Sequence, residues 1–180
     1  MHHELILAGF GGQGIMFAGQ LLTFAGMLED KHVSWIPSYG PEMRGGTANC
    51  SVVVSDNEIS SPIVTEPTVL LAFNLPSLDK FESNVLAEGL VVYNSSLIDR
   101  EPERTDFTAL KVPANEIAEK LGSAKVTNMV MLGAMIKKTG IVSIETVFHS
   151  LEKVLPDHRH KLIPLNKQAL QAGMDHADRA

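Results

Sequence analysis

The chain has 180 residues, of which 44% are hydrophobic and 20% charged, and its formal net charge is −6. This length suits one globular domain that folds without disulfides or metal, and an acidic chain without a basic cluster gives no sign of a nucleic-acid surface. The single cysteine, Cys50, excludes an internal disulfide. It also excludes a self-contained iron–sulfur cluster, which takes about four thiolates. We find neither a basic, apolar leader nor an apolar run of about 20 residues, and therefore expect a cytoplasmic protein without a membrane segment.

The first third of the chain predicts a strand, a helix and a second strand. The apolar run Glu4–Ala8 is typical of a strand that is buried on both faces. Residues 15–30 carry apolar side chains at helical spacing, and residues 32–36 read as the next strand. After a proline- and glycine-rich stretch, residues 48–62 favour a β-hairpin that turns at Asp56-Asn57.

The rest of the chain continues the alternation of predicted strands and helices. Apolar runs at residues 68–73, 89–96 and 107–113 predict three more strands, with a short helix near Pro76. Helices are expected at residues 114–122, 127–140, 143–155 and 160–177. The class is therefore α/β, one domain over 1–180 with a mostly parallel sheet, helices on both faces and an inserted hairpin. The C-terminal helices of residues 143–180 are expected to pack on this domain.

A glycine loop, "GFGGQGI", follows the first strand, and Gly9, Gly11 and Gly14 have the G-x-G-x-x-G spacing. Such a loop before a helix offers free N–H groups to a phosphate. A dinucleotide site is disfavoured because the second predicted strand ends without an acidic residue. A nucleotide P-loop is disfavoured because Ile15 and Met16, rather than lysine and serine, follow the last glycine. The loop either binds an anion or only makes a tight turn.

A second loop, "PSYGPEMRGGT", spans Pro37–Thr47. Arg44 has the planar fork that suits a carboxylate or a phosphate, while a structural turn with Arg44 in a salt bridge is the alternative. The carboxyl ends of parallel strands gather at one edge of a sheet, so both loops should face the same crevice. The candidate site residues are Gly9, Gly11, Gly12, Gln13, Gly14, Ser38, Tyr39, Gly40, Pro41, Glu42, Met43, Arg44, Gly45 and Gly46.

Together the two loops resemble the gamma subunit of the 2-oxoacid:ferredoxin oxidoreductases, most of all the 2-oxoglutarate type. The likeness continues through "EISSPIV", "LLAFN", "GLVVYNSSLI" and "TNMVMLGAMIKKTG". It implies a Rossmann-like domain in a heteromeric complex that converts a 2-oxoacid to an acyl-coenzyme A and passes electrons to ferredoxin. It implies that Arg44 is the charged anchor for a coenzyme A phosphate or a partner carboxylate.

The resemblance also assigns the cofactors to other chains. Thiamine diphosphate and its Mg would lie between alpha and beta subunits, and iron–sulfur clusters in the beta subunit or a ferredoxin-like delta subunit. Coenzyme A would come near the two loops. The residues agree, because we find neither a thiamine-type G-D-G…N motif nor a G-x-S-x-G nucleophile motif. The chain is expected to hold no cofactor or metal stably by itself.

Alternatives remain at this point. The chain could be a free-standing nucleotide- or flavin-binding module, or the same subunit of an indolepyruvate or branched-chain 2-oxoacid enzyme. The helix at residues 127–140 is apolar nearly all round, so it is buried against the sheet or partly against a partner. If such surface is left uncovered, the isolated chain should self-associate. The "DHRH" histidines at 158 and 160 are expected on the solvated surface, and Cys50 inside a strand.

Overall fold

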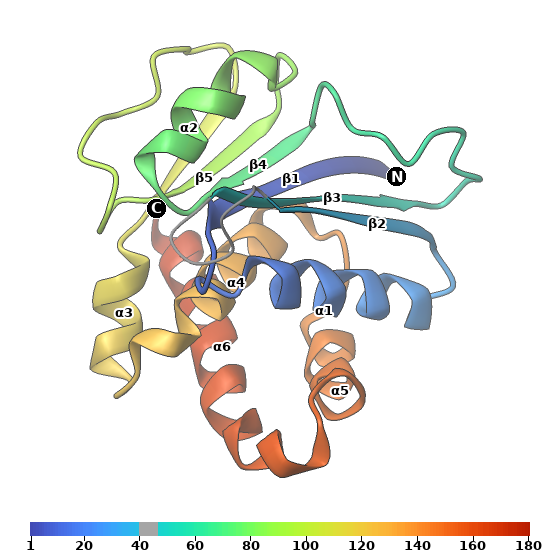
Figure 1. The fold of residues 1–180 in the computed structure, drawn as a ribbon, viewed down its shortest axis with the longest axis vertical. Coiled ribbons are helices and arrows are strands. Elements are labelled where there is room, and N and C mark those ends of the chain that lie inside the picture. The colour runs from blue at the N-terminus through green and yellow to red at the C-terminus, as the bar shows by residue number, and fades with distance from the viewer. Residues whose placement is uncertain (40–46) are drawn as a thin grey trace.

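The computed structural model describes residues 1–39 and 47–180 as a six-stranded sheet in the order β2-β3-β1-β4-β5-β6 (Figure 1). The strands are β1 (His2–Phe10), β2 (His32–Tyr39), β3 (Thr47–Ser55), β4 (Val69–Ala72), β5 (Leu90–Asn94) and β6 (Thr108–Val112). Strand β1 runs parallel to β4, β4 to β5 and β5 to β6, whereas β3 lies antiparallel to both β1 and β2. The predicted α/β domain with a mostly parallel sheet is confirmed.

The predicted position of the hairpin is wrong. Strand β3 pairs with β2 and β1, and residues 57–62, the predicted second arm of the hairpin, form no strand. The consecutive residues Val52, Val53 and Val54 are fully buried. Because neighbouring residues of a strand face opposite sides of the sheet, such a run requires cover on both faces. This requirement places β3 inside the sheet, between β1 and β2.

Strand β2 consequently lies at the edge of the sheet and does not pair with β1. The predicted β–loop–α–β start, in which the first two strands would be neighbours, is corrected in this respect. The strand also runs on through Pro37 to Tyr39, where the sequence predicts a loop. Proline lacks an N–H donor and is tolerated in edge strands, so Pro37 does not end β2.

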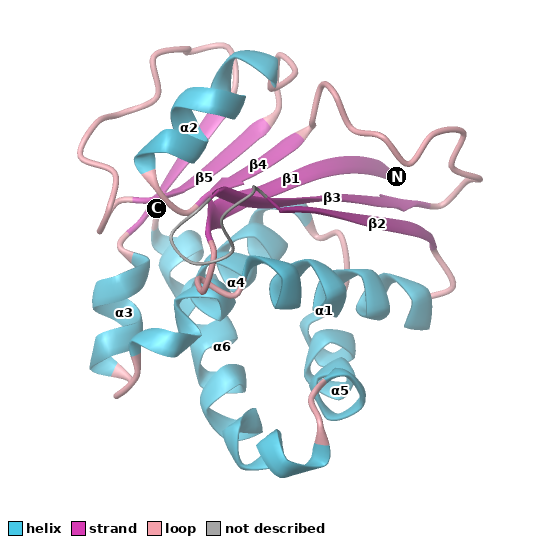
Figure 2. Cartoon of the chain, in the orientation of Figure 1, coloured by secondary structure: helices cyan, strands magenta, loops and turns pink. Residues whose placement is uncertain are grey.

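In the described part of the chain, six α-helices and three short 3₁₀-helices lie on the two sides of the sheet (Figure 2). The α-helices are α1 (Ile15–Leu28), α2 (Leu75–Phe81), α3 (Ala114–Lys120), α4 (Thr127–Thr139), α5 (Ile144–Val154) and α6 (Ile163–Arg179). The 3₁₀-helices are η1 (Glu82–Asn84), η2 (Ala124–Val126) and η3 (Asp157–Leu162). Helix α2 covers one face, while α1 and α4 lie on the other with α5 and α6 packed outside them. The prediction of helices on both faces is confirmed.

Helix α4 forms the centre of the helical layer. Its residues from Thr127 to Ile136 are all buried, between the sheet and α6. A Cβ atom on Gly133 would lie 2.0 Å from the carbonyl oxygen of Leu170, and one on Gly173 would lie 2.0 Å from that of Val130. The two glycines therefore let α4 and α6 approach backbone to backbone, and the apolar surface of α4 is covered by this chain.

Candidate functional site at the glycine loop

The glycine loop joins the end of β1 to the start of α1. A Cβ atom on Gly9 would lie 2.5 Å from Oε1 of Gln13 and 2.9 Å from Cβ of Phe73. Gly12 and Gly14 adopt φ angles of 94° and 75°, which are left-handed conformations that favour glycine. The tight turn therefore requires glycine at Gly9, Gly12 and Gly14. This requirement is met without a ligand. Gly11 lies in the same turn and does not adopt a left-handed backbone.

The Gln13 side chain braces this loop from inside. Its Oε1 accepts a hydrogen bond from the N–H of Phe10 at 2.6 Å and another from Nδ2 of Asn74 at 3.3 Å. The Gln13 N–H donates to the Phe10 carbonyl at 3.2 Å. The structure thus places Gln13 at the predicted loop, with its carbonyl oxygen already engaged by the protein.

The start of α1 carries no acidic side chain of its own and no side-chain cap from the described residues. Gly14 is the N-cap, no side chain caps the helix, and the first turn carries no acidic residue. Nδ2 of Asn128, on α4, donates to the Gly14 carbonyl at 3.1 Å and holds the turn in place. A helix start leaves its first N–H groups without intrahelical partners and carries a partial positive charge. This geometry can receive an anion.

Ser38 and Tyr39 bring the second predicted loop to the same edge. Tyr39 pairs with Ala48 across β2 and β3, and Ala48 pairs with Gly9 across β3 and β1. Since neighbouring strands are about 4.8 Å apart, Tyr39 lies about 10 Å from Gly9 along one row of the sheet. Its side chain is 55% exposed. The other predicted residues, Gly40, Pro41, Glu42, Met43, Arg44, Gly45 and Gly46, lie outside the described residues, and their roles remain predictions.

A row of buried amides supports this edge, and the sequence analysis did not identify it. Asn74 follows β4 and is 3% exposed; its Oδ1 accepts from the N–H of Ser77 at 3.0 Å and so caps α2. Asn94 ends β5 and is fully buried. Its Nδ2 donates to Oδ1 of Asn115 at 2.8 Å, and its Oδ1 accepts from the N–H of Ala114 at 3.2 Å. The available signal was an asparagine directly after an apolar run, in "LLAFN" and "LVVYN".

Two adjoining cavities open beside the glycine loop. The larger, of about 490 Å³, lies between Gly14 and Phe17 on one side and the η3–α6 segment on the other. The smaller, of about 120 Å³, lies over Gly12 and Gln13. Lys125 lines both cavities, and Arg159 lines the larger one. Among residues 1–39 and 47–180, none that lines either cavity is acidic, although the chain as a whole has a net charge of −6.

Lys125 and Arg159 are the functional candidates that the sequence analysis missed. Both are exposed, and neither forms an ion pair with a residue in the described part of the chain. Arg159 belongs to the "DHRH" stretch, of which the sequence analysis considered only the two histidines. Of these, His160 forms a hydrogen bond through Nε2 with the Leu155 carbonyl at 2.9 Å. Among the described residues, no group of three or more His, Cys, Asp or Glu could hold a metal ion.

The interpretation as a dinucleotide site is weakened further by the sheet order. In a dinucleotide-binding fold the second strand lies beside the first and supplies the acid for the ribose. Here antiparallel β3 occupies that place, and the described end of β2 carries Ser38 and Tyr39. Cys50 offers no alternative chemistry, because it lies fully buried in β3 and burial raises the pKa of its thiol to about 12.

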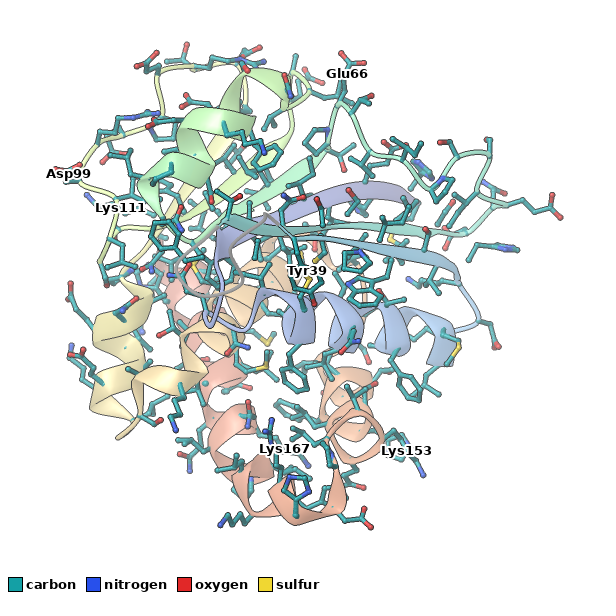
Figure 3. The ribbon with its side chains drawn as sticks, viewed as in Figure 1. Tyr39, Glu66, Asp99, Lys111, Lys153 and Lys167 are labelled. Atoms are coloured by element: carbon teal, nitrogen blue, oxygen red, sulfur yellow. The ribbon has the colours of Figure 1, made fainter. Side chains whose placement is uncertain are left out.

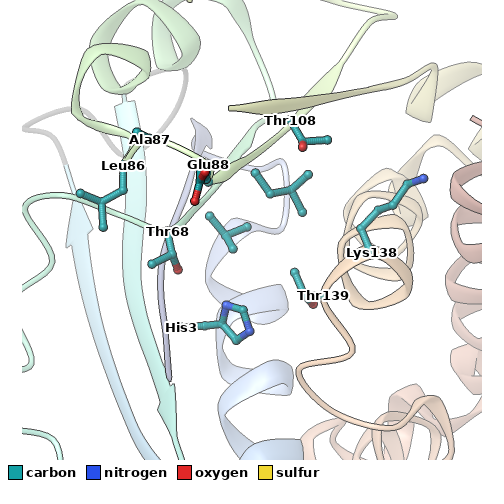
Figure 4. A pocket seen from close by; sticks show the side chains of 11 residues that line it. His3, Thr68, Leu86, Ala87, Glu88, Thr108, Lys138 and Thr139 are labelled. Carbon is teal, nitrogen blue, oxygen red and sulfur yellow. The ribbon is translucent and has the colours of Figure 1, made fainter. Parts of the chain in front are cut away.

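A further cavity, of about 470 Å³, lies at the opposite end of the strands (Figure 4). Three of its polar side chains have partners within the protein, whereas Nδ1 of His3 is buried without one among the described residues. The Thr68 hydroxyl donates to the Glu4 carbonyl at 3.1 Å, the Thr139 hydroxyl donates to the Met135 carbonyl at 2.9 Å, and Nζ of Lys138 donates to the Ala180 carbonyl at 3.3 Å. Glu88 brings a carboxylate to the same cavity. This cavity therefore lacks the uncompensated positive charge of the glycine-loop site.

Comparison with known protein families finds one match, which covers most of the chain. The family model described as "Pyruvate ferredoxin/flavodoxin oxidoreductase" matches residues 4–176. None of the helices in the described ranges, 1–39 and 47–180, has the length and apolar character that a membrane crossing needs.

Two characterised relatives illustrate the match. The chain is 41% identical over 172 residues to the ketoisovalerate oxidoreductase subunit VorA of Methanothermobacter marburgensis, an alignment that covers 95% of this chain and 36% of VorA. It is 40% identical over 161 residues to the 2-oxoglutarate synthase subunit KorC of Methanocaldococcus jannaschii, covering 87% of this chain and 83% of KorC. The chain thus spans little more than a third of the length of VorA and most of the length of KorC.

Solved structures show the same fold. The gamma subunit of a keto/oxoacid ferredoxin oxidoreductase from Geobacter sulfurreducens superposes with a TM-score of 0.85 at 29% identity, over 99% of both chains. A 2-oxoglutarate:ferredoxin oxidoreductase from Magnetococcus marinus, solved with 2-oxoglutarate, coenzyme A and succinyl-CoA, gives a TM-score of 0.90 at 23% identity. That match covers 99% of this chain and 31% of the other.

Proposed function

The chain belongs to the pyruvate ferredoxin/flavodoxin oxidoreductase family, and we propose that it is the gamma subunit of a multi-subunit 2-oxoacid:ferredoxin oxidoreductase. The proposal agrees with the resemblance of the two loops to the gamma subunit of the 2-oxoacid:ferredoxin oxidoreductases. The observation that carries it is the anion-receptive crevice at the glycine loop, in a chain whose single cysteine falls short of the about four thiolates of an iron–sulfur cluster. Cys50, the single cysteine, is fully buried in β3, and burial raises the pKa of its thiol to about 12.

In this proposal the chemistry is divided between subunits. Partner chains, the alpha and beta subunits and in some assemblies a ferredoxin-like delta subunit, hold thiamine diphosphate, Mg and the iron–sulfur clusters. They decarboxylate the 2-oxoacid and deliver electrons to ferredoxin. This chain supplies a rigid edge beside the shared site, built from the glycine loop and the asparagine row. We place the complex in the cytoplasm.

We further propose that the crevice at the glycine loop receives coenzyme A, the co-substrate of the reaction. Coenzyme A carries a diphosphate and a further phosphate, which suit an uncapped helix start and two cations. Lys125 and Arg159 provide those cations, and none of the described residues that line the cavities is acidic. Phe17 and Leu165 line the larger cavity and offer apolar contact. The relative from Magnetococcus marinus, which was solved with coenzyme A bound, supports this assignment.

For the 2-oxoacid itself we propose 2-oxoglutarate. KorC, named for 2-oxoglutarate, aligns with 87% of this chain over 83% of its own length. VorA, named for ketoisovalerate, contains the domain within a chain nearly three times as long. A branched-chain 2-oxoacid or indolepyruvate is the alternative, because the residues that distinguish 2-oxoacids lie in the partner subunits of this proposal.

The test is purification of the native complex, identification of its chains and assay of ferredoxin reduction with each 2-oxoacid. We expect coenzyme A-dependent turnover with 2-oxoglutarate that is lost when this chain is omitted from a reconstituted complex. Full turnover of the alpha and beta subunits without this chain would overturn the proposal. Micromolar binding of NAD or FMN to the isolated chain would favour a free-standing nucleotide- or flavin-binding module instead.

A further inference from the structure

The side-chain amide of Gln13 is held in one orientation by the protein. Its Oε1 accepts from the backbone N–H of Phe10 at 2.6 Å, and a backbone N–H can only donate. Oε1 also accepts from Nδ2 of Asn74 at 3.3 Å, and Asn74 is itself oriented because its Oδ1 accepts from the N–H of Ser77. Nε2 of Gln13 has no hydrogen-bond partner in residues 1–39 and 47–180. The two hydrogens of this nitrogen are therefore available to a ligand.

The side chain of Asn115 is oriented in the same way, through Asn94. Nδ2 of Asn94 donates to the Phe73 carbonyl at 3.4 Å, and its Oδ1 accepts from the N–H of Ala114 at 3.2 Å. Both partners are backbone groups with a single role, so Asn94 can take only this orientation. Its Nδ2 also donates to Oδ1 of Asn115 at 2.8 Å. Nδ2 of Asn115 is then the free end of this chain of hydrogen bonds, with no partner among the described residues.

Both amides line the same small cavity, the one of about 120 Å³, which Lys125 also lines. They come from segments far apart in the chain, because Gln13 lies in the glycine loop and Asn115 in α3. Thr127, a further polar residue of this cavity, donates its hydroxyl hydrogen to a backbone carbonyl at 2.8 Å and adds no donor. The cavity belongs to the edge of the sheet where β2 ends at Tyr39, which Figure 3 labels. Two partly exposed amides and a lysine thus converge there.

The chemistry of these groups determines which ligand they suit. Amide nitrogens and ammonium groups only donate hydrogen bonds, whereas an ionised phosphate or carboxylate only accepts them. A cation would be repelled by Lys125 and would find no acceptor on either amide nitrogen. Hydrogen bonds to an ionised acceptor are about twice as strong as those between neutral groups. Pockets that enclose a whole small molecule measure about 300–1,000 Å³, so a cavity of about 120 Å³ suits a single oxyanion group of a larger ligand.

We propose that Gln13 and Asn115 are ligand-binding residues whose amide nitrogens donate to one oxyanion group, a phosphate or a carboxylate, in the small cavity. Lys125 complements the charge of this group, and the remainder of the ligand lies in the adjoining cavity that Lys125 also lines. The inference rests on the proposed function, because the group belongs to its coenzyme A or its 2-oxoacid. Since the protein orients both amides before the ligand arrives, little side-chain freedom is lost on binding.

Side-chain NMR tests the contact directly. The side-chain NH₂ signals of the ¹⁵N-labelled chain would be followed during titration with inorganic phosphate, coenzyme A and 2-oxoglutarate. We expect the signals of Gln13 and Asn115 to shift together and to saturate, and the signal of exposed Asn84 to stay in place. A shift with phosphate and coenzyme A identifies the group as a phosphate, and a shift with 2-oxoglutarate alone identifies it as a carboxylate. Signals that stay in place with all three probes would overturn the inference.

Two isosteric variants separate binding from folding. Gln13→Glu and Asn115→Asp keep the oxygen that accepts from the protein and replace the donating nitrogen by a second carboxylate oxygen. In the assembled complex each should raise the KM for coenzyme A, or for 2-oxoglutarate where only that probe shifts the signals, by about ten-fold or more, because a donor to a charged group is lost. The melting temperature of the isolated chain should not fall. Asn84→Asp is the matched control, since it adds the same charge at an exposed asparagine whose Oδ1 also accepts a hydrogen bond, from Ser83, and it should change neither quantity.

The outcomes separate this inference from the proposed function. A loss of stability without a change in KM would show that the two amides only support the loop, and the inference would be wrong. An active complex in which both variants keep the wild-type KM would also contradict it, and the proposed function would then stand. Shifted signals in a chain for which no 2-oxoacid oxidoreductase complex can be recovered would uphold the oxyanion site and remove the proposed function instead.

Discussion

The two ends of the strands each carry a cavity of similar size, about 490 Å³ at the glycine loop and about 470 Å³ at the opposite end. They differ in what their polar groups do. Around the far cavity, Thr68, Lys138 and Thr139 are all bonded within the protein. At the glycine loop, a helix start without a cap lies beside two cations without described ion pairs. Positive charge without a described ion pair, more than volume, therefore distinguishes the end of the sheet at which we propose that a ligand binds.

The largest expected effect comes from the loop backbone. Gly14→Ala should destabilise the protein by roughly 2–4 kcal/mol, because φ is 75° and the new Cβ would lie 2.4 Å from Nδ2 of Asn128. Gly12→Ala is the matched control: φ is 94° but no atom lies within 4 Å, so only the backbone strain of about 1 kcal/mol remains. Chemical denaturation measures both. Equal losses would show that the contact with α4 does not hold the loop.

The cations should affect coenzyme A next most strongly. In the assembled complex, Lys125→Ala and Arg159→Ala should each raise the KM for coenzyme A by about 10–100-fold, because a hydrogen bond to a charged group contributes about 1.5–3 kcal/mol. Lys120→Ala removes an exposed lysine that lines neither cavity, and Lys138→Ala removes one from the far cavity. Both controls should leave the KM unchanged. A similar rise with Lys138→Ala would abolish the contrast between the two ends.

The asparagine row offers a smaller test at the same end. Asn74→Ala removes the cap of α2 and the hydrogen bond to Gln13, and should lower the free energy of unfolding by about 1–2 kcal/mol. If the hydrogen bond from Asn74 to Gln13 maintains the conformation of the glycine loop, the KM for coenzyme A should also rise. Asn84→Ala, at the end of η1 and exposed, is the control and should change neither quantity. A variant with unchanged stability and an unchanged KM would show that the glycine loop keeps its conformation without Asn74.

The smallest expected effect is the contribution of His3, at the end of the strands opposite the glycine loop, to the pH dependence of stability. Burial, and next the nearby positive charges of His2, the N-terminus and Lys31, hold the pKa of His3 below its usual value of 6.5. The folded state therefore binds fewer protons than the unfolded state between the folded pKa and 6.5. Stability is present in full above about pH 6.5 and declines as the pH falls through the folded pKa. Denaturation at pH 7 and pH 5 should show a smaller decline in His3→Gln than in the wild type or in exposed His158→Gln. An unchanged decline would contradict the assignment to His3.

The sequence predicted most helices and strands because their signals are local. The Ser143 cap is one example: its Oγ accepts from the N–H of Thr146 at 3.1 Å, where the pattern predicted a helix start. Gly140 ends α4 with a φ of 61°, as a terminal glycine should. The hairpin prediction failed because it paired neighbours in sequence. The run of buried valines in β3 signalled two-sided burial, but it could not say which strands would supply it.

The site divides in the same way. The sequence by itself determined the glycine turn, since a left-handed backbone and a close approach can be met only by particular residues at particular positions. It also determined the lack of a cluster-binding cysteine set and the presence of asparagines after apolar strands. Only the tertiary structure decided that Lys125 and Arg159 lie beside Gly14, that β3 separates β1 from β2, and that β2 is left at an edge. These features depend on contacts between residues far apart in the chain. The periodicity of the sequence predicts local helices and strands, and it does not predict which of them come into contact.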